Sequence, residues 1–158
     1  MKKLLLLLPA FFLITSCSSD NDPEDNRAKQ YPVNIKLSTI FSESEINSIS
    51  TYGGSTLYIY QKDHPTIPTG NRGIYVKRDP GETKAFDLAC PYEWDKRVQL
   101  VLDEYGAFKC SSCGSIYNPN TCKAVEGIAQ KSGATMIQYK VEIQEKTIVS
   151  KKDVIITN

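Results

Sequence analysis

Apolar and polar residues alternate along several short stretches of the chain, and a spacing of two is typical of strands with one buried face. The clearest stretch is TMIQYKVEIQEKTIVS, residues 135–150. Shorter strands are predicted over residues 55–63 and 72–79, and DVIITN, residues 153–158, forms a last strand. Four apolar side chains are expected on the inner face of the longest stretch: Ile137, Tyr139, Val141 and Ile143. A chain dominated by such stretches is predicted to be all-β.

Residues 96–110, KRVQLVLDEYGAFKC, indicate a β-hairpin in which DEYG makes the turn. Three apolar residues of its first strand share one face, namely Val98, Leu100 and Leu102. Only SESEINSI, residues 42–49, indicates a helix, and Ser42 or Ser44 is its expected N-cap. The helical content is therefore expected to be small.

The N-terminus reads MKKLLLLLPAFFLITSC, with two lysines followed by an apolar run shorter than the roughly 20 residues that a spanning helix needs. Thr15 and Ser16, both small, precede Cys17. This pattern resembles the lipobox of bacterial lipoproteins. The resemblance implies that residues 1–16 are a signal peptide and that Cys17 is diacylated, which anchors the mature chain stably in a lipid bilayer. The alternative is an ordinary secretory signal followed by a chance cysteine.

Residues 17–30 continue as CSSDNDPEDNRAKQ, which is polar and acidic after the cysteine. Such a segment buries no apolar surface and is predicted to be a disordered tether. An acidic run directly after the cysteine also resembles the surface-export signals of Bacteroidetes lipoproteins, although a plain solvated tether has the same composition. The expected location is the bacterial outer membrane, on the periplasmic or the cell-surface side, and residues 31–158 are left as the folded domain.

Charge and motifs exclude several function classes. Lys and Arg number 19 against 18 Asp and Glu, and removal of Lys2 and Lys3 with the signal peptide changes the net charge from +1 to −1. No basic stripe is available for nucleic acid. The chain has no G-x-S-x-G, H-E-x-x-H or glycine-rich phosphate motif, and His64 reads as a solvated loop residue beside Pro65. The protein is therefore predicted not to be an enzyme.

Apart from Cys17, the cysteines are Cys90, Cys110, Cys113 and Cys122. In an exported chain an even number of cysteines favours two disulfides, for which three pairings are possible. A tetrahedral Cys₄ zinc site is the competing interpretation, which the C-x-x-C spacing of residues 110–113 favours. The isolated positions of the other two cysteines weaken it.

The surroundings of these cysteines resemble the Rieske iron–sulfur domain over about residues 55–158. That family has C-x-H in one loop and C-x-x-H in a second. In FDLACPYEW, Cys90 matches the first cysteine and Tyr92 falls at the first histidine position. In FKCSSCGSIYN, Cys110 matches the second cysteine and Cys113 falls at the second histidine position. Further matches are Gly114, Ser115 and Tyr117, which follow the second loop, and Gly127, Ile128 and Ala129, which stand where the family has Gly-Pro-Ala. The resemblance implies an antiparallel β-sandwich or barrel with two cysteine-bearing loops.

The cofactor does not follow from the resemblance. The usual [2Fe–2S] centre needs two histidines, and the whole chain has only His64, so that centre is excluded by counting. Tyr92 is a poor substitute because its phenol ionises only near pH 10. Because the two family cysteines ligate the same iron, the resemblance implies that Cys90 and Cys110 lie close enough for a disulfide, for which Cys113 would compete.

Two functional interpretations remain open. The first is a non-enzymatic envelope lipoprotein, without a cofactor, whose degenerate Rieske-like domain is a structural or binding module. The second is an electron-transfer or metal-binding protein that uses cysteine ligands, with zinc or an all-cysteine iron–sulfur cluster. In the second case Cys90, Cys110 and Cys113 are the ligands, and the fourth is Cys122, Tyr92 or water. No protein partner is indicated.

Overall fold

The computed structural model describes residues 31–158 except 52 and 147–150. The predicted signal peptide, the lipidated Cys17 and the acidic tether therefore lie outside the described residues. Within the described ranges, no helix has the length and apolar character needed to cross a bilayer.

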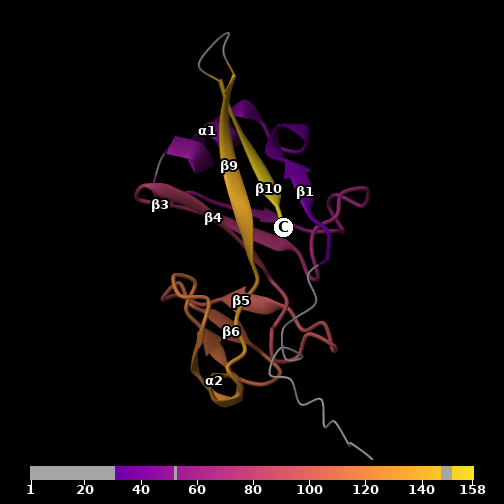
Figure 1. Cartoon of the computed structure of the whole chain (residues 1–158), viewed down its shortest axis with the longest axis vertical. Coiled ribbons are helices and arrows are strands. Elements are labelled where there is room, and N and C mark those ends of the chain that lie inside the picture. The colour runs from indigo at the N-terminus through magenta and orange to yellow at the C-terminus, as the bar shows by residue number, and fades with distance from the viewer. Residues whose placement is uncertain (1–30, 52, 147–150) are drawn as a thin grey trace, which may run out of the picture.

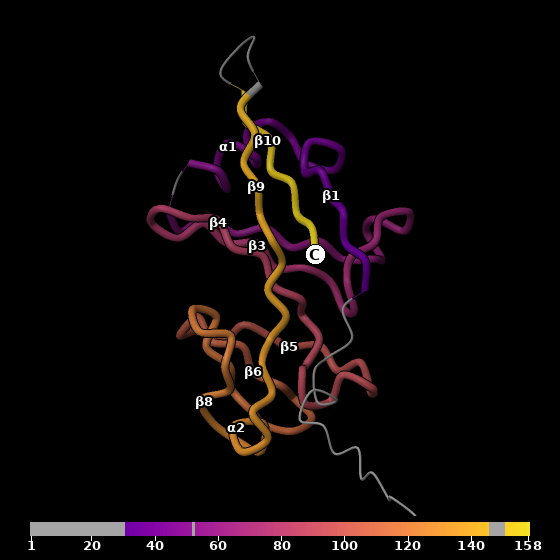
Figure 2. Tube along the Cα trace, in the orientation of Figure 1, coloured from indigo at the N-terminus to yellow at the C-terminus, as the bar shows by residue number. Residues whose placement is uncertain are grey.

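Two antiparallel sheets make up most of the domain, as the all-β prediction requires, and they occupy the upper and lower halves of Figure 1. The larger sheet has six strands in the spatial order β1 (Asn34–Lys36), β10 (Lys151–Thr157), β9 (Gln138–Lys146), β4 (Glu82–Asp87), β3 (Ile74–Asp79) and β2 (Thr56–Ile59). The smaller sheet has four strands in the order β5 (Leu100–Leu102), β6 (Phe108–Cys110), β7 (Ile116–Tyr117) and β8 (Ala124–Glu126). Figure 2 shows the chain entering β9 from the lower half and running upward beside β10.

Three short helical segments complete the described fold: η2 (Leu37–Thr39), α1 (Glu43–Thr51) and α2 (Ile128–Ser132). Helix α1 confirms the helix predicted over residues 42–49, and its cap is Ser42. The Glu45 backbone N–H donates to Ser42 Oγ over 3.4 Å, while the Ser42 N–H donates to the Glu45 carboxylate over 2.8 Å. This reciprocal pair is a capping box, and it satisfies donors that the first helical turn leaves open.

The larger sheet encloses an aliphatic core together with α1. Ile46 and Ile49 of the helix are buried against inward side chains of the strands. Alternation places Val154 and Ile156 of β10 on this inner face, where both are fully buried. The remaining aliphatic members include Ile35, Leu37, Ile59, Ile74 and Val76.

A second core, rich in aromatic rings, joins the two sheets. Phe108 of β6 is fully buried, and its ring centroid lies 5.2 Å from that of Tyr75 in β3 and 6.3 Å from that of Phe86 in β4. Tyr117 of β7 belongs to the same cluster. Because the rings come from both sheets, this core holds the smaller sheet, and the loops beside it, on the larger one.

The predicted strands are found with shifted ends, and one residue of the inner face is less buried than expected. Strand β9 begins at Gln138, and Tyr139 within it and Ile137 just before it are buried as expected. Ile143 lies on the same face, opposite the buried Val154 of β10, but it is 36% exposed. The reason is that β4 pairs with β9 only around Tyr139, so the far half of β9 has only β10 as a neighbour.

Candidate metal centre

Two loops at the edge of the smaller sheet carry the cysteines. Cys90 lies after β4, where its N–H donates to the Val98 carbonyl over 2.8 Å and its carbonyl accepts from the Glu93 N–H over 3.2 Å. Cys110 ends β6, and a tight turn follows it. In that turn the Gly114 N–H donates to the Cys110 carbonyl over 3.0 Å, and Gly114 has a positive φ of 70°. The turn folds the C-x-x-C segment back on itself, which brings Cys113 toward Cys110.

Packing behind the second loop fixes its position. Ser115 is fully buried, and its Oγ accepts the Ala129 N–H of α2 over 3.1 Å. At Gly127 a Cβ would lie 2.6 Å from Ser115 Oγ, so only glycine permits this approach. The Gly127-Ile128-Ala129 segment therefore packs against the loop that follows Cys110 and holds it in place.

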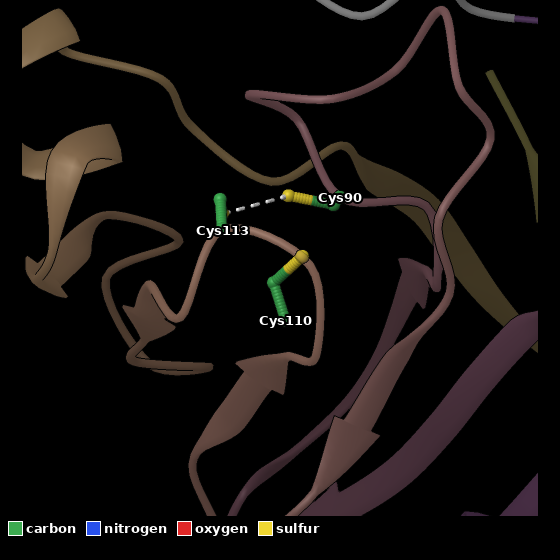
Figure 3. Close-up of side chains that lie close together, drawn as sticks. All are labelled: Cys90, Cys110 and Cys113. Carbon is green, nitrogen blue, oxygen red and sulfur yellow. Dashed lines mark hydrogen bonds between the residues drawn. The ribbon is translucent and has the colours of Figure 1, made fainter.

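The sulfur atoms of Cys90, Cys110 and Cys113 lie within 4.8 Å of one another, and Figure 3 shows the three side chains close together on the two loops. The Cys90 and Cys113 sulfurs are 3.9 Å apart. Thiolates on one tetrahedral ion with bonds of about 2.3 Å would be about 3.8 Å apart, whereas a disulfide requires about 2.05 Å. These three side chains can hold a metal ion. All four described cysteines are free thiols, and the predicted disulfide between Cys90 and Cys110 is not formed in this structure.

Burial and hydrogen bonding shift the pKa values of the three thiols in different directions. Cys90 and Cys110 are fully buried. Burial raises the pKa of Cys90, and it raises the pKa of Cys110 to about 12. Burial would also raise the pKa of Cys113, but hydrogen bonds with Ser115 and the neighbouring thiols outweigh it and lower that pKa. Cys113, partly exposed, is therefore the thiol with the greatest thiolate character before a metal binds.

Polar groups surround the thiols on the protein side. The Tyr117 hydroxyl lies 3.4 Å from Cys90 Sγ, and Cys110 Sγ lies 3.7 Å from a carboxylate oxygen of Glu93. Glu93 is only 5% exposed and pairs with Lys96 over 2.9 Å. A hydrogen bond with Ser112, and then that with Lys96, lowers the pKa of Glu93. The sequence indicated Tyr117 but not Glu93, whose one signal is its place in the Cys90 turn.

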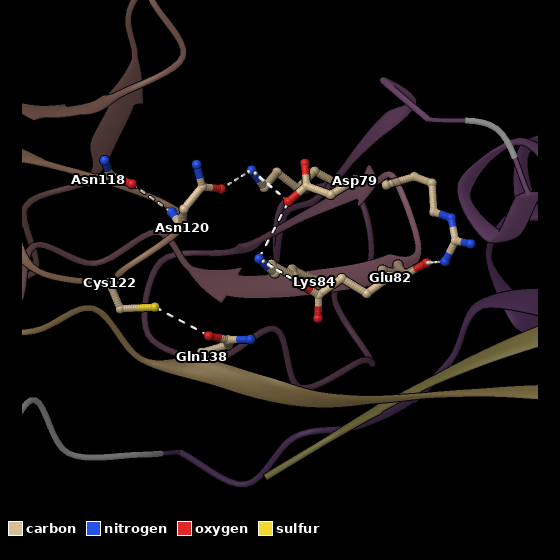
Figure 4. A network of polar contacts seen from close by, with 10 residues as sticks. Asp79, Glu82, Lys84, Asn118, Asn120, Cys122 and Gln138 are labelled. Carbon is tan, nitrogen blue, oxygen red and sulfur yellow. Dashed lines mark hydrogen bonds and ion pairs between the residues drawn. The ribbon is translucent and has the colours of Figure 1, made fainter.

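The fourth cysteine lies apart from this group. Cys122 Sγ contacts the Gln138 side-chain oxygen over 3.3 Å, as Figure 4 shows. Nearby, Lys84 bridges Asp79 and Glu82 over 3.5 and 2.8 Å. The structure thus brings together three of the four candidate cysteines, and a Cys₄ site is not assembled among the described residues.

Tyr92, the remaining side-chain candidate for the fourth ligand, and His64, the one histidine of the chain, also lie outside the thiol group. Tyr92 is 37% exposed. His64 lies between β2 and β3, where its ring meets Phe41 edge-on at 6.1 Å. The residues present therefore do not fit a two-histidine iron–sulfur centre.

Comparisons of the chain with protein-family models, with curated proteins and with solved structures found no match. The resemblance to Rieske domains stays a prediction, and the function has to be argued from the site itself.

Proposed function

We propose that this protein is a lipid-anchored, non-enzymatic envelope protein whose β domain binds one thiophilic metal ion through Cys90, Cys110 and Cys113. The observation that carries the proposal is the convergence of three thiol sulfurs within 4.8 Å, from two separate loops.

The ligand set favours a soft or borderline ion. Thiolates select zinc, copper(I) and iron over magnesium or calcium. The 3.9 Å between the Cys90 and Cys113 sulfurs is close to the separation across a tetrahedral zinc ion. The partly exposed side of Cys113 leaves room for water as the fourth ligand. A bound ion would connect the Cys90 loop to the C-x-x-C loop, which is a structural role and needs no redox turnover.

Metal content tests the proposal directly. The full chain, purified without chelators, should contain about one zinc equivalent, and Cys90→Ser or Cys113→Ser should lose at least about 90% of it, because two thiolates make a much weaker site. Elemental analysis and thiol titration give the measurement. Cys122→Ser is the matched control and should keep its metal, since its sulfur lies outside the group.

The same experiment separates the alternatives. Strong visible absorbance with bound iron and sulfide would replace the single-ion proposal with an iron–sulfur centre. Metal-free protein in which mass spectrometry finds Cys90 joined to Cys110 or Cys113 would replace it with a disulfide between the loops.

Membrane anchoring has its own test at Cys17. Replacing Cys17 with alanine should leave an unprocessed or unlipidated chain, because the thiol that carries the lipid is gone. Detergent phase partitioning and intact mass provide the measurement. A Cys17→Ala chain that still enters the detergent phase at the processed mass would contradict the lipoprotein assignment.

A further inference from the structure

A pocket of about 650 Å³ opens beside the loop that connects β2 to β3, and none of the three thiols that are proposed to bind metal lines it. Its walls come from residues 60–62, residues 69–73 and the residues that lead into β5. The volume is in the range of pockets that take small organic ligands. Its polar lining includes Gln61, Lys62, Asn71, Arg72, Arg97 and Gln99.

The charged side chains of this lining are all cationic. Lys62, Arg72 and Arg97 line the pocket, and no Asp or Glu does. Within the described residues, no ion pair joins any of the three to a carboxylate, whereas Lys84 and Lys96 elsewhere on the surface are each paired with one. Three like charges around one hollow repel each other, so the site favours an anion.

The pocket wall is held rigidly from behind. The Asn71 N–H and side-chain amide donate to the buried carboxylate of Asp87 over 2.7 and 2.9 Å, and the Tyr139 hydroxyl donates to it over 2.6 Å. At Gly70 a Cβ would lie 2.3 Å from the Tyr139 oxygen, so the loop can approach this network only with glycine there. A wall fixed in this way loses little conformational freedom when a ligand binds.

Arg97 shows a backbone constraint at the rim. Its φ is 51°, in the left-handed region that non-glycine residues rarely adopt. The side chain of Arg72 donates through Nε to the Arg97 carbonyl. This bond holds the Arg72 guanidinium at the pocket, and among the described residues no hydrogen bond occupies its terminal nitrogens.

We propose that this pocket binds an anionic sugar, that is, a small polyhydroxylated ligand bearing a carboxylate or a phosphate. The guanidinium groups of Arg72 and Arg97 match either anion in bidentate geometry. The Gln99 amide supplies a donor and an acceptor for hydroxyl groups. The Gln61 amide already donates to the Pro65 carbonyl and accepts from the Thr69 hydroxyl, which leaves it one donor and one acceptor for a ligand. No cysteine is among the residues that line this pocket.

Isothermal titration of the full chain in detergent micelles tests the proposal with four probes: glucuronate, glucose 6-phosphate, glucose and inorganic phosphate. At least one of the two charged sugars should bind with a dissociation constant below about 1 mM, and glucose at least about tenfold more weakly, because the charged contacts are lost. Which of the two charged sugars binds more tightly decides between carboxylate and phosphate. Raising the salt concentration should weaken binding.

Substitutions locate the site. Arg72→Gln and Lys62→Gln should each weaken binding of the charged sugar, Arg72→Gln by at least about tenfold, since each removes one cation. Lys109→Gln is the matched control, because Lys109 is an exposed cation on β6 outside the pocket. The affinity of this variant for the charged sugar should be unchanged. Melting temperatures show whether each variant is folded. Lys62 is exposed, and its ammonium lies 5.4 Å from the centroid of the Tyr60 ring, so its removal should leave the fold intact.

Three results would overturn the proposal. The first is that neither charged sugar binds at a concentration 10-fold above the expected dissociation constant. The second is that glucose binds as tightly as the charged sugars. The third is that the affinity for the charged sugar is unchanged in folded Arg72→Gln and Lys62→Gln chains. Inorganic phosphate that binds as tightly as glucose 6-phosphate would reduce the site to an ion site and also overturn it.

Discussion

Replacing Phe108 with alanine should lower the free energy of unfolding by about 3–5 kcal/mol, the range for removing a fully buried aromatic ring. Phe108 is 0% exposed and sits against Tyr75 and Phe86, so the cavity would open where the two sheets meet. Domains of this size have only about 5–15 kcal/mol of stability, and the change would therefore consume a large part of it. Urea or thermal denaturation followed by circular dichroism measures the difference.

Val101→Ala is the matched control for Phe108. Val101 lies on the neighbouring strand β5 and is 60% exposed, so its truncation should change stability by less than about 0.5 kcal/mol. If both variants lost the same small amount, the aromatic core would not be what holds the sheets together.

Strand β4 shows why alternation predicted some strands and missed others. Its last three residues, Ala85, Phe86 and Asp87, are all buried. Ala85 belongs to the aliphatic core, whereas Phe86 points to the other side and joins the aromatic core. A strand covered on both faces has no polar face, and ETKAFD therefore carries no period of two. The edge hairpin over residues 96–110 has an exposed face, and there the pattern correctly predicted β5 and β6.

Strands β7 and β8 were beyond the reach of pattern analysis for a different reason. They contain two and three residues, and a period cannot be recognised over so short a length. Helix α2 is likewise only five residues long and depends on packing against Ser115. These elements form because the larger sheet and the cysteine loops position them.

The candidate site could be predicted in part. Cysteine spacing and loop motifs indicated that Cys90, Cys110 and Cys113 belong together, and their sulfurs do converge. The sequence leaves the position of Cys122 open, because Cys122 follows the turn YNPNT and is one of three candidates for the fourth ligand. A turn decides it: the Cys122 N–H donates to the Asn118 carbonyl over 2.8 Å, and Cys122 adopts a positive φ of 59°.

The basic pocket could not be predicted from the sequence, because Lys62 and Arg97 are far apart along the chain and line the same pocket only in the folded domain.

Asp87→Ala should lower the free energy of unfolding by about 3 kcal/mol or more, because it leaves several buried donors without an acceptor. Asp87 is 1% exposed. Its carboxylate accepts from the Tyr139 hydroxyl, from both nitrogens of Asn71, and from the Ala89 N–H over 2.8 Å. This carboxylate connects β4, β9 and the loop before β3, so three segments lose a shared acceptor at once.

Asp79→Ala is the control, since Asp79 also ends a strand but pairs with Lys77 and Lys84 at the partly exposed surface. Its loss should cost about 1 kcal/mol or less, as surface ion pairs do.

Tyr139→Phe should cost about 1–2 kcal/mol, and it should cost less in the Asp87→Ala background, because the acceptor of its hydroxyl is already gone. Chemical denaturation of the two single variants and the double variant measures this coupling. Strictly additive losses would show that the Tyr139 hydroxyl and the Asp87 carboxylate stabilise the domain independently. That result would contradict a shared hydrogen-bond network between β4 and β9.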